Sequence, residues 1–244
     1  MKKTFLLSCL MLAAMPVMAA YTGHVYVDKN KNGVFDQSEK PLAGIKVSDG
    51  LNVVETAADG SFTLPGHERE RFIFITTPSG YKTFNRHYHK IEKKQSGYDF
   101  GLIPYSGRIR KDGSHRYIHI TDTEIFNTEN HADWVNNVHD YARNEQAAFI
   151  IHTGDICYEK GLKAHIKLMN TENMDCPVFY CIGNHDLVKG KYGEELFESI
   201  YGPVYYSFDA GNVHYVVTPM PGGDYAPGYT SDDVCRWLKN DLAH

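Results

Sequence analysis

Three short apolar segments in the second half of the chain alternate with two amphipathic ones, and this alternation constrains the fold more than any other feature. The apolar segments are RYIHI (116–120), AFIIH (148–152) and PVFYCI (177–182). Between them lie HADWVNNVHDYARNEQA (131–147) and GLKAHIKLMNTEN (161–173), whose apolar residues have helical spacing. The order strand, helix, strand, helix, strand predicts βαβ units, and hence a parallel sheet in an α/β domain over residues 113–244.

Each of the three predicted strands ends in polar residues, within the sequences ITDTE, HTGDICY and CIGNHD. Ligands of an open parallel sheet bind beyond the carboxyl ends of its strands, so these three ends should share one crevice. The side chains expected there are Asp122, Glu124, Asp155, Asn184, His185 and Asp186. Carboxylates packed so closely repel one another unless cations lie among them, so the pattern predicts a metal site.

The periodicity also predicts local detail. One face of the first helix segment carries Trp134, Val135, Val138, Tyr141 and Ala142. YYSFD (205–209) and VHYVV (213–217) are typical of two further strands, and TSDDVCRWLKNDLA (230–243) of an amphipathic helix capped by Ser231 or Asp232.

Residues 21–104 have a different rhythm. Short runs of alternating apolar and polar residues (GHVYV, GIKVS, LNVVET, SFTL and RFIFIT) are separated by turn pairs such as Asp49-Gly50 and Asp59-Gly60. This pattern predicts a small antiparallel all-β domain.

A calcium-loop spacing lies inside this β region. DKNKNGVFDQSE places Asp28, Asn30, Asn32, Gly33, Asp36 and Glu39 at positions one, three, five, six, nine and twelve. Oxygen ligands at alternate positions converge on a hard cation, and glycine permits the sharp turn. Because strands and Pro41 flank the loop, we expect a structural calcium site between strands; an Asx-rich connection without an ion is the alternative.

The first residues predict export. Lys2 and Lys3 precede an apolar run and a small-residue cleavage site, so we assign residues 1–20 to a signal peptide and expect a secreted or periplasmic protein. No later segment approaches the ~20 apolar residues of a membrane helix. The formal net charge of −5 offers no basic surface for nucleic acid.

Four cysteines follow the predicted cleavage site. If Cys176 and Cys181 lie on one extended strand, they are ~16 Å apart, too far for a disulfide. We expect all four, Cys157, Cys176, Cys181 and Cys235, to be free and buried.

The GD pair at 154–155, followed about thirty residues later by GNHD at 183–186, resembles the calcineurin-like metallophosphoesterase family. The resemblance extends from Arg116 to the end of the chain and includes YGPVYYSFDAGNVHYVV. The preceding β region is similar to an immunoglobulin-like or transthyretin-like N-terminal module of some exported members. The expected fold is therefore an α+β sandwich-type phosphoesterase preceded by a small immunoglobulin-like domain.

This resemblance implies two divalent ions, with manganese, zinc, iron and magnesium as candidates. Asp122 would bind the first ion, Asp155 would bridge both, and Asn184 would bind the second. His185 would not bind metal but would act near the leaving group as a proton donor or charge stabiliser, oriented by Asp186. The implied reaction is hydrolysis of phosphate esters or anhydrides by hydroxide generated from bound water.

The chain departs from the family pattern in two places. The family's first motif is usually Asp-x-His, whereas Glu124 stands here, an oxygen ligand that favours harder metals. The family also takes histidine ligands from later motifs that nothing after Asp186 matches. His214 lies in an apolar strand and is expected in the core, and His244 is the last residue. We therefore expect that the chain stops before those motifs and is weakly active or inactive alone.

Two alternatives stay open. GDICY fits the GDxxY form of purple acid phosphatases, in which Tyr158 would bind ferric iron. The chain could instead be a non-catalytic binding or surface-interaction protein with a degenerate hydrolase domain. Of the remaining histidines, His119 and His152 could support the metal site, and the run containing His87 and His89 is expected at a solvated strand edge. The sequence narrows the substrate only to a phosphorylated small molecule or envelope component.

Overall fold

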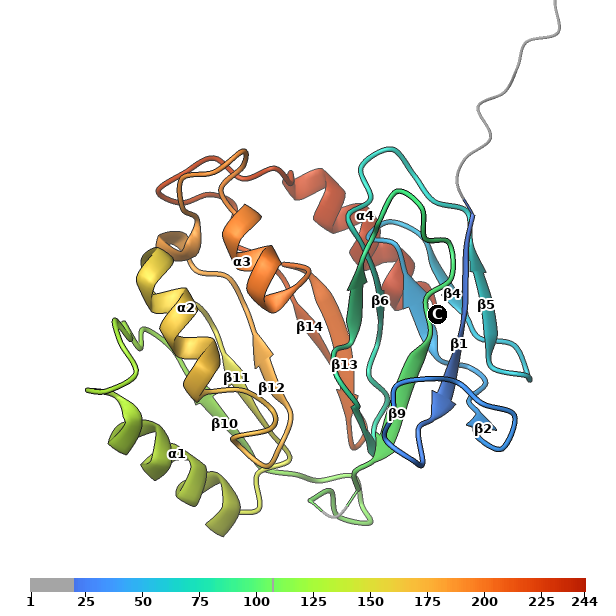
Figure 1. Cartoon of the computed structure of the whole chain (residues 1–244), viewed down its shortest axis with the longest axis horizontal. Helices are drawn as coiled ribbons and strands as arrows, with labels where there is room; N and C mark the ends of the chain where they lie inside the picture. Colours follow the sequence, from blue (N-terminus) through green and yellow to red (C-terminus); the bar gives the residue numbers. More distant parts are fainter. Residues whose placement is uncertain (1–19, 107) are drawn as a thin grey trace, which may run out of the picture.

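The computed structural model describes residues 20–106 and 108–244, so the predicted signal segment lies outside the described residues except for Ala20. A β-sandwich is followed by an α/β part with a parallel sheet, and the two lie side by side (Figure 1). This arrangement confirms the fold class expected from the sequence.

The β-sandwich consists of two sheets. One contains β1 (Tyr21–Val27), β2 (Lys40–Pro41), β5 (Ser61–Leu64), β7 (Tyr81–Thr83) and β9 (Phe100–Pro104). The other contains β3 (Lys46–Ser48), β4 (Val53–Glu55), β6 (Phe72–Ile75) and β8 (Tyr88–Lys90). Alternate residues of both sheets, among them Val25, Val47 and Phe100, fill the core between them, as the strand period requires.

The sandwich is not wholly antiparallel as expected. Its first and last strands, β1 and β9, pair in parallel, with Val25 opposite Phe100. Alternation along one strand identifies its inward side chains but carries no information about which distant strand lies beside it, and so the sequence could not reveal this pairing.

The predicted parallel sheet is present, in the order β10 (Tyr117–Ile120), β11 (Phe149–His152) and β12 (Val178–Tyr180). The helices α1 (Ala132–Asn144) and α2 (Tyr158–Leu168) connect these strands and cover one side of the sheet (Figure 1). Ile150 and Val178 pack toward the helices, whereas Phe149 and Phe179 lie in the core on the other side.

A hairpin of β13 (Tyr206–Ala210) and β14 (Val213–Val217) covers that other side (Figure 1). The rings of Phe179 and Phe208 stack with their centroids 3.6 Å apart. Phe208 also forms an isolated bridge with Thr77 of the sandwich. One apolar cluster joins Phe72 and Phe74 of the sandwich to Phe149, Phe179 and Phe208, so the two parts are packed against each other rather than tethered.

Several local predictions were wrong in detail. Val135 and Ala142 of α1 are buried as expected, but Trp134 and Tyr141 are 40% and 59% exposed. α4 (Ser231–Ala243) begins after Thr230, whose Oγ1 accepts the N–H of Asp233, so the cap is neither Ser231 nor Asp232. The sequence also gave no signal for α3 (Glu195–Tyr201) or for the 3₁₀ turn η1 (Asn184–Asp186).

The four cysteines within the described chain are all free, as expected. Cys157 and Cys176 are buried, but Cys181 is only partly buried and Cys235 is exposed, so the expected burial was wrong for these two. No helix among the described residues has the length and apolar character to cross a membrane.

Candidate metal centre

The ends of the three parallel strands are joined by backbone hydrogen bonds that extend the sheet. Asp122 N–H donates to the carbonyl oxygen of Gly154 at 3.1 Å, and Cys181 N–H to that of His152 at 2.7 Å. The three predicted polar ends therefore lie together at one edge of the sheet, as the strand order requires.

Two glycines let the second and third strand ends meet. A Cβ atom on Gly154, whose φ is +101°, would lie 2.3 Å from the nitrogen of Gly183. A Cβ on Gly183 would lie 2.2 Å from Oδ1 of Asp155. Since neither approach leaves room for a side chain, these glycines allow the loops that carry Asp155 and Asn184 to come into contact.

The carboxylate of Asp186 stabilises this contact by hydrogen-bonding both loops. It is fully buried and accepts the N–H of Cys157 at 2.9 Å and that of Gly183 at 3.0 Å. Burial raises the pKa of Asp186, although the two N–H donors oppose the shift. Asp155 makes a similar link, because its Oδ1 accepts the N–H of His185 at 3.1 Å.

Several residues at these strand ends have a left-handed backbone conformation. Non-glycine residues with positive φ at the strand ends are Asp122, Glu124, Asp155, Cys157 and Tyr158, with values from 45° to 91°. Such conformations cost of order 1 kcal/mol or more each and cluster where function requires a particular side-chain direction.

The predicted metal ligands supply oxygen atoms only. Asp122 and Glu124 are exposed, and Asp155 and Asn184 are partly buried. Oδ2 of Asp122 accepts the hydroxyl of Thr121 at 2.6 Å, whereas the side chains of Glu124 and Asn184 form no hydrogen bond within the described chain. Carboxylate and amide oxygens suit hard divalent cations such as magnesium and manganese, so the donor set fits the implied ions.

These donors are spread out. In the part of the chain that the structure describes, the carboxylate oxygens of Asp122, Glu124 and Asp155 do not all lie within 4.8 Å of one another. Ligands on one small cation, each at about 2.1 Å, are separated by no more than about 4 Å. The three carboxylates therefore do not surround a single point.

His185 is held by a residue that the sequence did not indicate. Its Nδ1 lies 3.1 Å from Oδ2 of Asp224, and the hydroxyl of Tyr158 lies 3.3 Å from the same nitrogen. The hydrogen bond to Asp224, with the nearby charges of Asp155 and Asp186, raises the pKa of His185. Asp224 belongs to an irregular Gly-Gly-Asp segment 39 positions away, and no motif or periodicity marks it.

Asp186 does not orient the His185 imidazole as expected. Both carboxylate oxygens of Asp186 are taken by backbone N–H groups of the loops, so this residue braces the strand ends instead of orienting the imidazole.

Tyr158 lies beside His185 at the first turn of α2. Partial desolvation and the nearby Asp224 carboxylate raise the pKa of its phenol.

Neighbouring histidines support the strand ends. His152 is fully buried, which lowers its pKa to about 4. Its Nδ1 accepts the N–H of Gly154 at 3.2 Å, so Nε2 carries the proton and donates to Thr123 Oγ1 at 2.9 Å. His119 contacts Thr153 Oγ1 at 2.8 Å. Both histidines thus link the first strand end to the second.

His214 does not lie in an apolar core as expected. It is partly exposed, and its two ring nitrogens each lie 2.7 Å from a carboxylate, of Asp209 and of Asp241. Asp241 is 1% exposed and accepts the hydroxyl of Ser207 at 2.9 Å and, on its carbonyl, Lys46 Nζ at 2.9 Å. This polar network joins α4 to the β-sandwich.

His87 also departs from expectation. Its Nε2 is buried without a hydrogen-bond partner among the described residues, and burial lowers its pKa to about 3. Its neighbour on β8, Tyr88, is buried as well, and the His87 ring packs against Tyr206, so this end of the run faces the α/β part. β8 is the edge strand of its sheet, as expected, and His89 is only partly buried.

The calcium-loop residues lie together in the connection after β1. Asp28 is 1% exposed and accepts the N–H groups of Asn32 at 3.1 Å and Gly33 at 2.9 Å. Glu39, 6% exposed, accepts Lys29 N–H at 3.0 Å. Neither carboxylate has an ion-pair partner in the described chain, so the loop buries two negative charges that a cation would neutralise.

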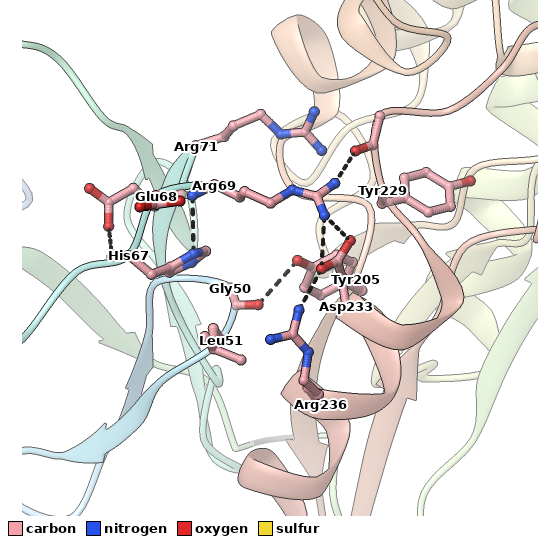
Figure 2. Close-up of a pocket in the computed structure, with 12 residues that line it drawn as sticks. Gly50, Leu51, His67, Glu68, Arg69, Arg71, Tyr205, Tyr229, Asp233 and Arg236 are labelled. Carbon is pink, nitrogen blue, oxygen red and sulfur yellow. Dashed lines mark hydrogen bonds and ion pairs between the residues drawn. The ribbon is translucent and has the colours of Figure 1, made fainter.

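A sizeable pocket lies away from the strand ends. A pocket of about 600 Å³ lies between the sandwich and α4, and Figure 2 shows Arg69, Arg71 and Arg236 extending into it. It includes none of the strand-end residues. Its arginines are already paired, Arg69 and Arg236 with Asp233 and Arg71 with Glu194.

Beside this pocket, ligand atoms of Asp49, His67 and Glu70 lie within 4.8 Å of one another, so they could hold a metal ion. Their carboxylates have protein donors, however. Asp49 accepts Leu51 N–H and Asn52 N–H, and Glu70 accepts His67 N–H and the hydroxyl of Tyr21. The set therefore also serves to hold the loops in place.

Comparison with known proteins agrees with this geometry. Residues 29–104 match the model of the N terminal of calcineurin-like phosphoesterase. Residues 115–237, half of the chain, match the calcineurin-like phosphoesterase model itself. No curated protein matches the chain. The second match contains all three strand ends and every residue placed at them here, and the chain belongs to the calcineurin-like phosphoesterase family.

Proposed function

We propose that this protein is an exported, two-metal phosphoesterase that hydrolyses phosphate esters or anhydrides. The observation that carries the proposal is the contact between the loops of Asp155 and Asn184, which Gly154 and Gly183 permit and Asp186 fastens. It brings oxygen donors from three strand ends to one edge of the sheet in a chain of this family.

The residues that would hold the ions are Asp122, Asp155 and Asn184, with Glu124 as an additional oxygen donor. The number of ions, two, rests on the family resemblance. Two divalent cations would polarise the phosphoryl group and lower the pKa of the attacking water. Oxygen-only donors favour manganese or magnesium.

The protein's own acid would be His185. Its backbone N–H is fixed by Asp155, and its Nδ1 by Asp224, so the imidazole stands beside the ligand loops in a defined orientation. A proton donated from Nε2 to the leaving oxygen would complete the cleavage of the ester bond. Cys157 contributes no nucleophile, because burial and the surrounding carboxylates raise the pKa of its thiol to about 11.

Export rests on the N-terminal segment 1–20, and the substrate would be a phosphorylated small molecule or envelope component. The net charge of −5 supports neither a nucleic-acid nor another polyanionic partner. In the same proposal the loop of Asp28 and Glu39 binds a structural calcium ion.

Hydrolysis of 4-nitrophenyl phosphate at increasing Mn²⁺, Mg²⁺, Zn²⁺ and Fe²⁺ concentrations tests the proposal. Activity should require a metal and fall at least ~100-fold in Asp155→Asn and His185→Ala. Asp140→Asn, an exposed carboxylate on α1, is the matched control and should retain full activity. Equal metal-dependent turnover in all four proteins would refute the assignment. A visible phenolate band with iron would instead favour the Tyr158 alternative.

A further inference from the structure

The carboxylate that contacts the His185 imidazole comes from a segment outside the GD and GNHD motifs. Asp224 lies in the irregular segment 218–230 between β14 and α4, which we call the strap. We propose that Asp224 is the positioning residue for His185, fixing its ring orientation and tautomer. The catalytic consequence of this inference rests on the proposed function. The contact between Asp224 and His185 is independent of that function.

The contact determines which nitrogen is available for proton transfer. Oδ2 of Asp224 lies 3.1 Å from Nδ1, and an ionised carboxylate can only accept, so Nδ1 carries a proton and donates it. In the neutral ring Nε2 is then the unprotonated nitrogen, and it can pick up a proton and deliver it to a leaving oxygen. The side chains are comparably accessible, with 38% and 35% exposed, so solvent reaches this pair.

Asp186 cannot take this role. It is fully buried, and its two oxygens are engaged by the N–H groups of Cys157 and Gly183. Within the described residues, Asp224 is the carboxylate in ion-pair range of the His185 ring.

The backbone of the strap places Asp224 directly on the GNHD turn. Asp224 N–H donates to the carbonyl oxygen of Asn184 at 3.2 Å. A Cβ on Gly223 would lie 2.5 Å from that same oxygen, so the strap rests on the turn without space for a side chain. The segment therefore contacts both a predicted metal ligand and the predicted acid.

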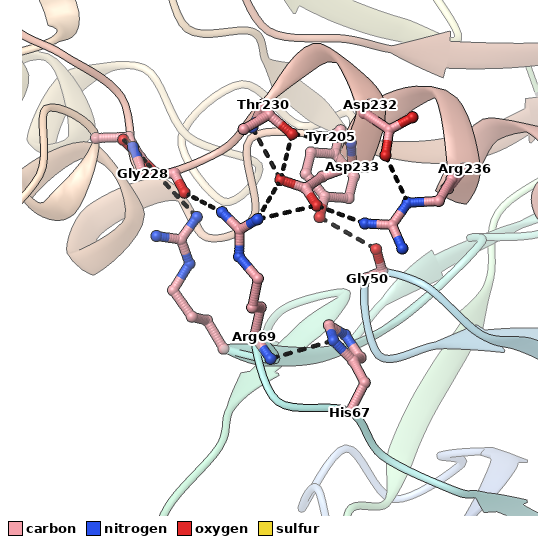
Figure 3. Close-up of polar contacts among 11 residues, drawn as sticks. Gly50, His67, Arg69, Tyr205, Gly228, Thr230, Asp232, Asp233 and Arg236 are labelled. Carbon is pink, nitrogen blue, oxygen red and sulfur yellow. Dashed lines mark hydrogen bonds and ion pairs between the residues drawn. The ribbon is translucent and has the colours of Figure 1, made fainter.

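The other end of the strap is anchored to buried charges and to the β-sandwich. Gly228 N–H donates to the buried carboxylate of Glu194 at 2.8 Å, and Glu194 pairs with Arg71. The carbonyl of Gly228 accepts Arg69 Nη2 at 2.8 Å, and Arg69 also pairs with Asp233 at the start of α4 (Figure 3). Two arginines of the N-terminal domain thus hold the segment that orients His185.

Leaving-group dependence is the first test, because a lost proton donor matters most for a poor leaving group. Asp224→Ala should lower kcat for an alkyl phosphate at least ~10-fold more than kcat for 4-nitrophenyl phosphate, with KM changed less than ~3-fold. Asp224→Glu should restore part of the loss. Asp232→Asn, an exposed carboxylate just beyond the strap, is the control and should match the wild type.

The second test needs no activity. In the metal-free protein, the ¹⁵N shifts of His185 should show a protonated Nδ1 in the wild type and in Asp232→Asn, and a shifted tautomer population in Asp224→Ala. Unchanged ¹⁵N shifts in Asp224→Ala, or an equal loss of kcat for both esters, would overturn the inference. If the wild type hydrolyses neither ester, the proposed function fails, and the ¹⁵N shifts alone decide whether Asp224 positions His185.

Discussion

The buried carboxylate of Asp186 accepts the backbone N–H of Cys157 at 2.9 Å, although the two residues are 29 positions apart and follow different strands. Asp186 also accepts the N–H of Gly183, within its own turn. The two hydrogen bonds together attach the GNHD turn to the loop that carries Asp155 and Cys157. The geometry of the candidate centre therefore depends on a buried carboxylate that forms no hydrogen bond with the His185 imidazole.

Asp186→Asn tests this bracing role. An amide keeps the shape of the side chain but turns an NH₂ group toward one of two backbone N–H donors, leaving that donor buried without an acceptor. The expected loss in free energy of unfolding is about 1–3 kcal/mol, measured by urea denaturation. Asp140→Asn on the exposed face of α1 should change it by less than about 0.5 kcal/mol. Equal stabilities of Asp186→Asn and wild type would show that the bond contributes nothing.

Gly183→Ala tests the close approach of the two loops. The added methyl group would lie 2.2 Å from Oδ1 of Asp155, so the loops must separate and the protein should lose at least about 2 kcal/mol of stability and most of its Mn²⁺ affinity. Gly97→Ala is the matched control, because nothing lies within 4 Å of its added Cβ. Thermal unfolding and Mn²⁺ titration should distinguish the two variants; similar behaviour would mean that the loops are not in contact.

The stability of the protein should depend on pH through Glu198, which lies at the interface between the two parts. Burial raises its pKa to about 7, against the opposing effect of Arg71 3.0 Å away, from a usual value of 4.5. Because the folded-state pKa is the higher one, the stabilising contribution is complete below pH 4.5 and is lost as the pH rises through 7.

We therefore expect the wild type to lose up to about 3 kcal/mol of stability relative to Glu198→Gln between pH 4.5 and pH 8. Urea denaturation of both proteins across this range measures the difference. A difference that is constant with pH would contradict the raised pKa of Glu198.

Calcium should stabilise the β-sandwich through the loop of Asp28. At a Ca²⁺ concentration of 100 Kd, binding to the folded state alone adds about 2.7 kcal/mol, which should raise the Tm by several degrees. Asp28→Asn should abolish this shift. Asp112→Asn removes a carboxylate from another turn and should preserve it. If the Tm of the wild type does not change when Ca²⁺ is added, the segment is an Asx-rich connection without an ion.

Local periodicity was sufficient to predict the strands and most helices of the α/β part. The order of β10, β11 and β12 also placed Asp122, Asp155 and Asn184 at one edge of a sheet, since parallel strands end on the same side. The family resemblance added roles for these residues, and the family itself is confirmed.

What the sequence did not reveal depends on contacts between distant segments. Asp224 became important because the strap crosses the GNHD turn, and neither its spacing nor its neighbours indicated that crossing. Trp134 and Tyr141 matched the apolar face of α1, but only Val135 and Ala142 of that face are buried against the sheet. The parallel pairing of β1 with β9 likewise depends on where the chain returns, which alternation does not record.

The most direct test of the metal centre is the anomalous difference map of a crystal grown with abundant Mn²⁺. We predict two neighbouring peaks at the strand ends, both in contact with Asp155, one also with Asp122 and the other with Asn184. A map without peaks there, with these three side chains bound only to solvent, would contradict it.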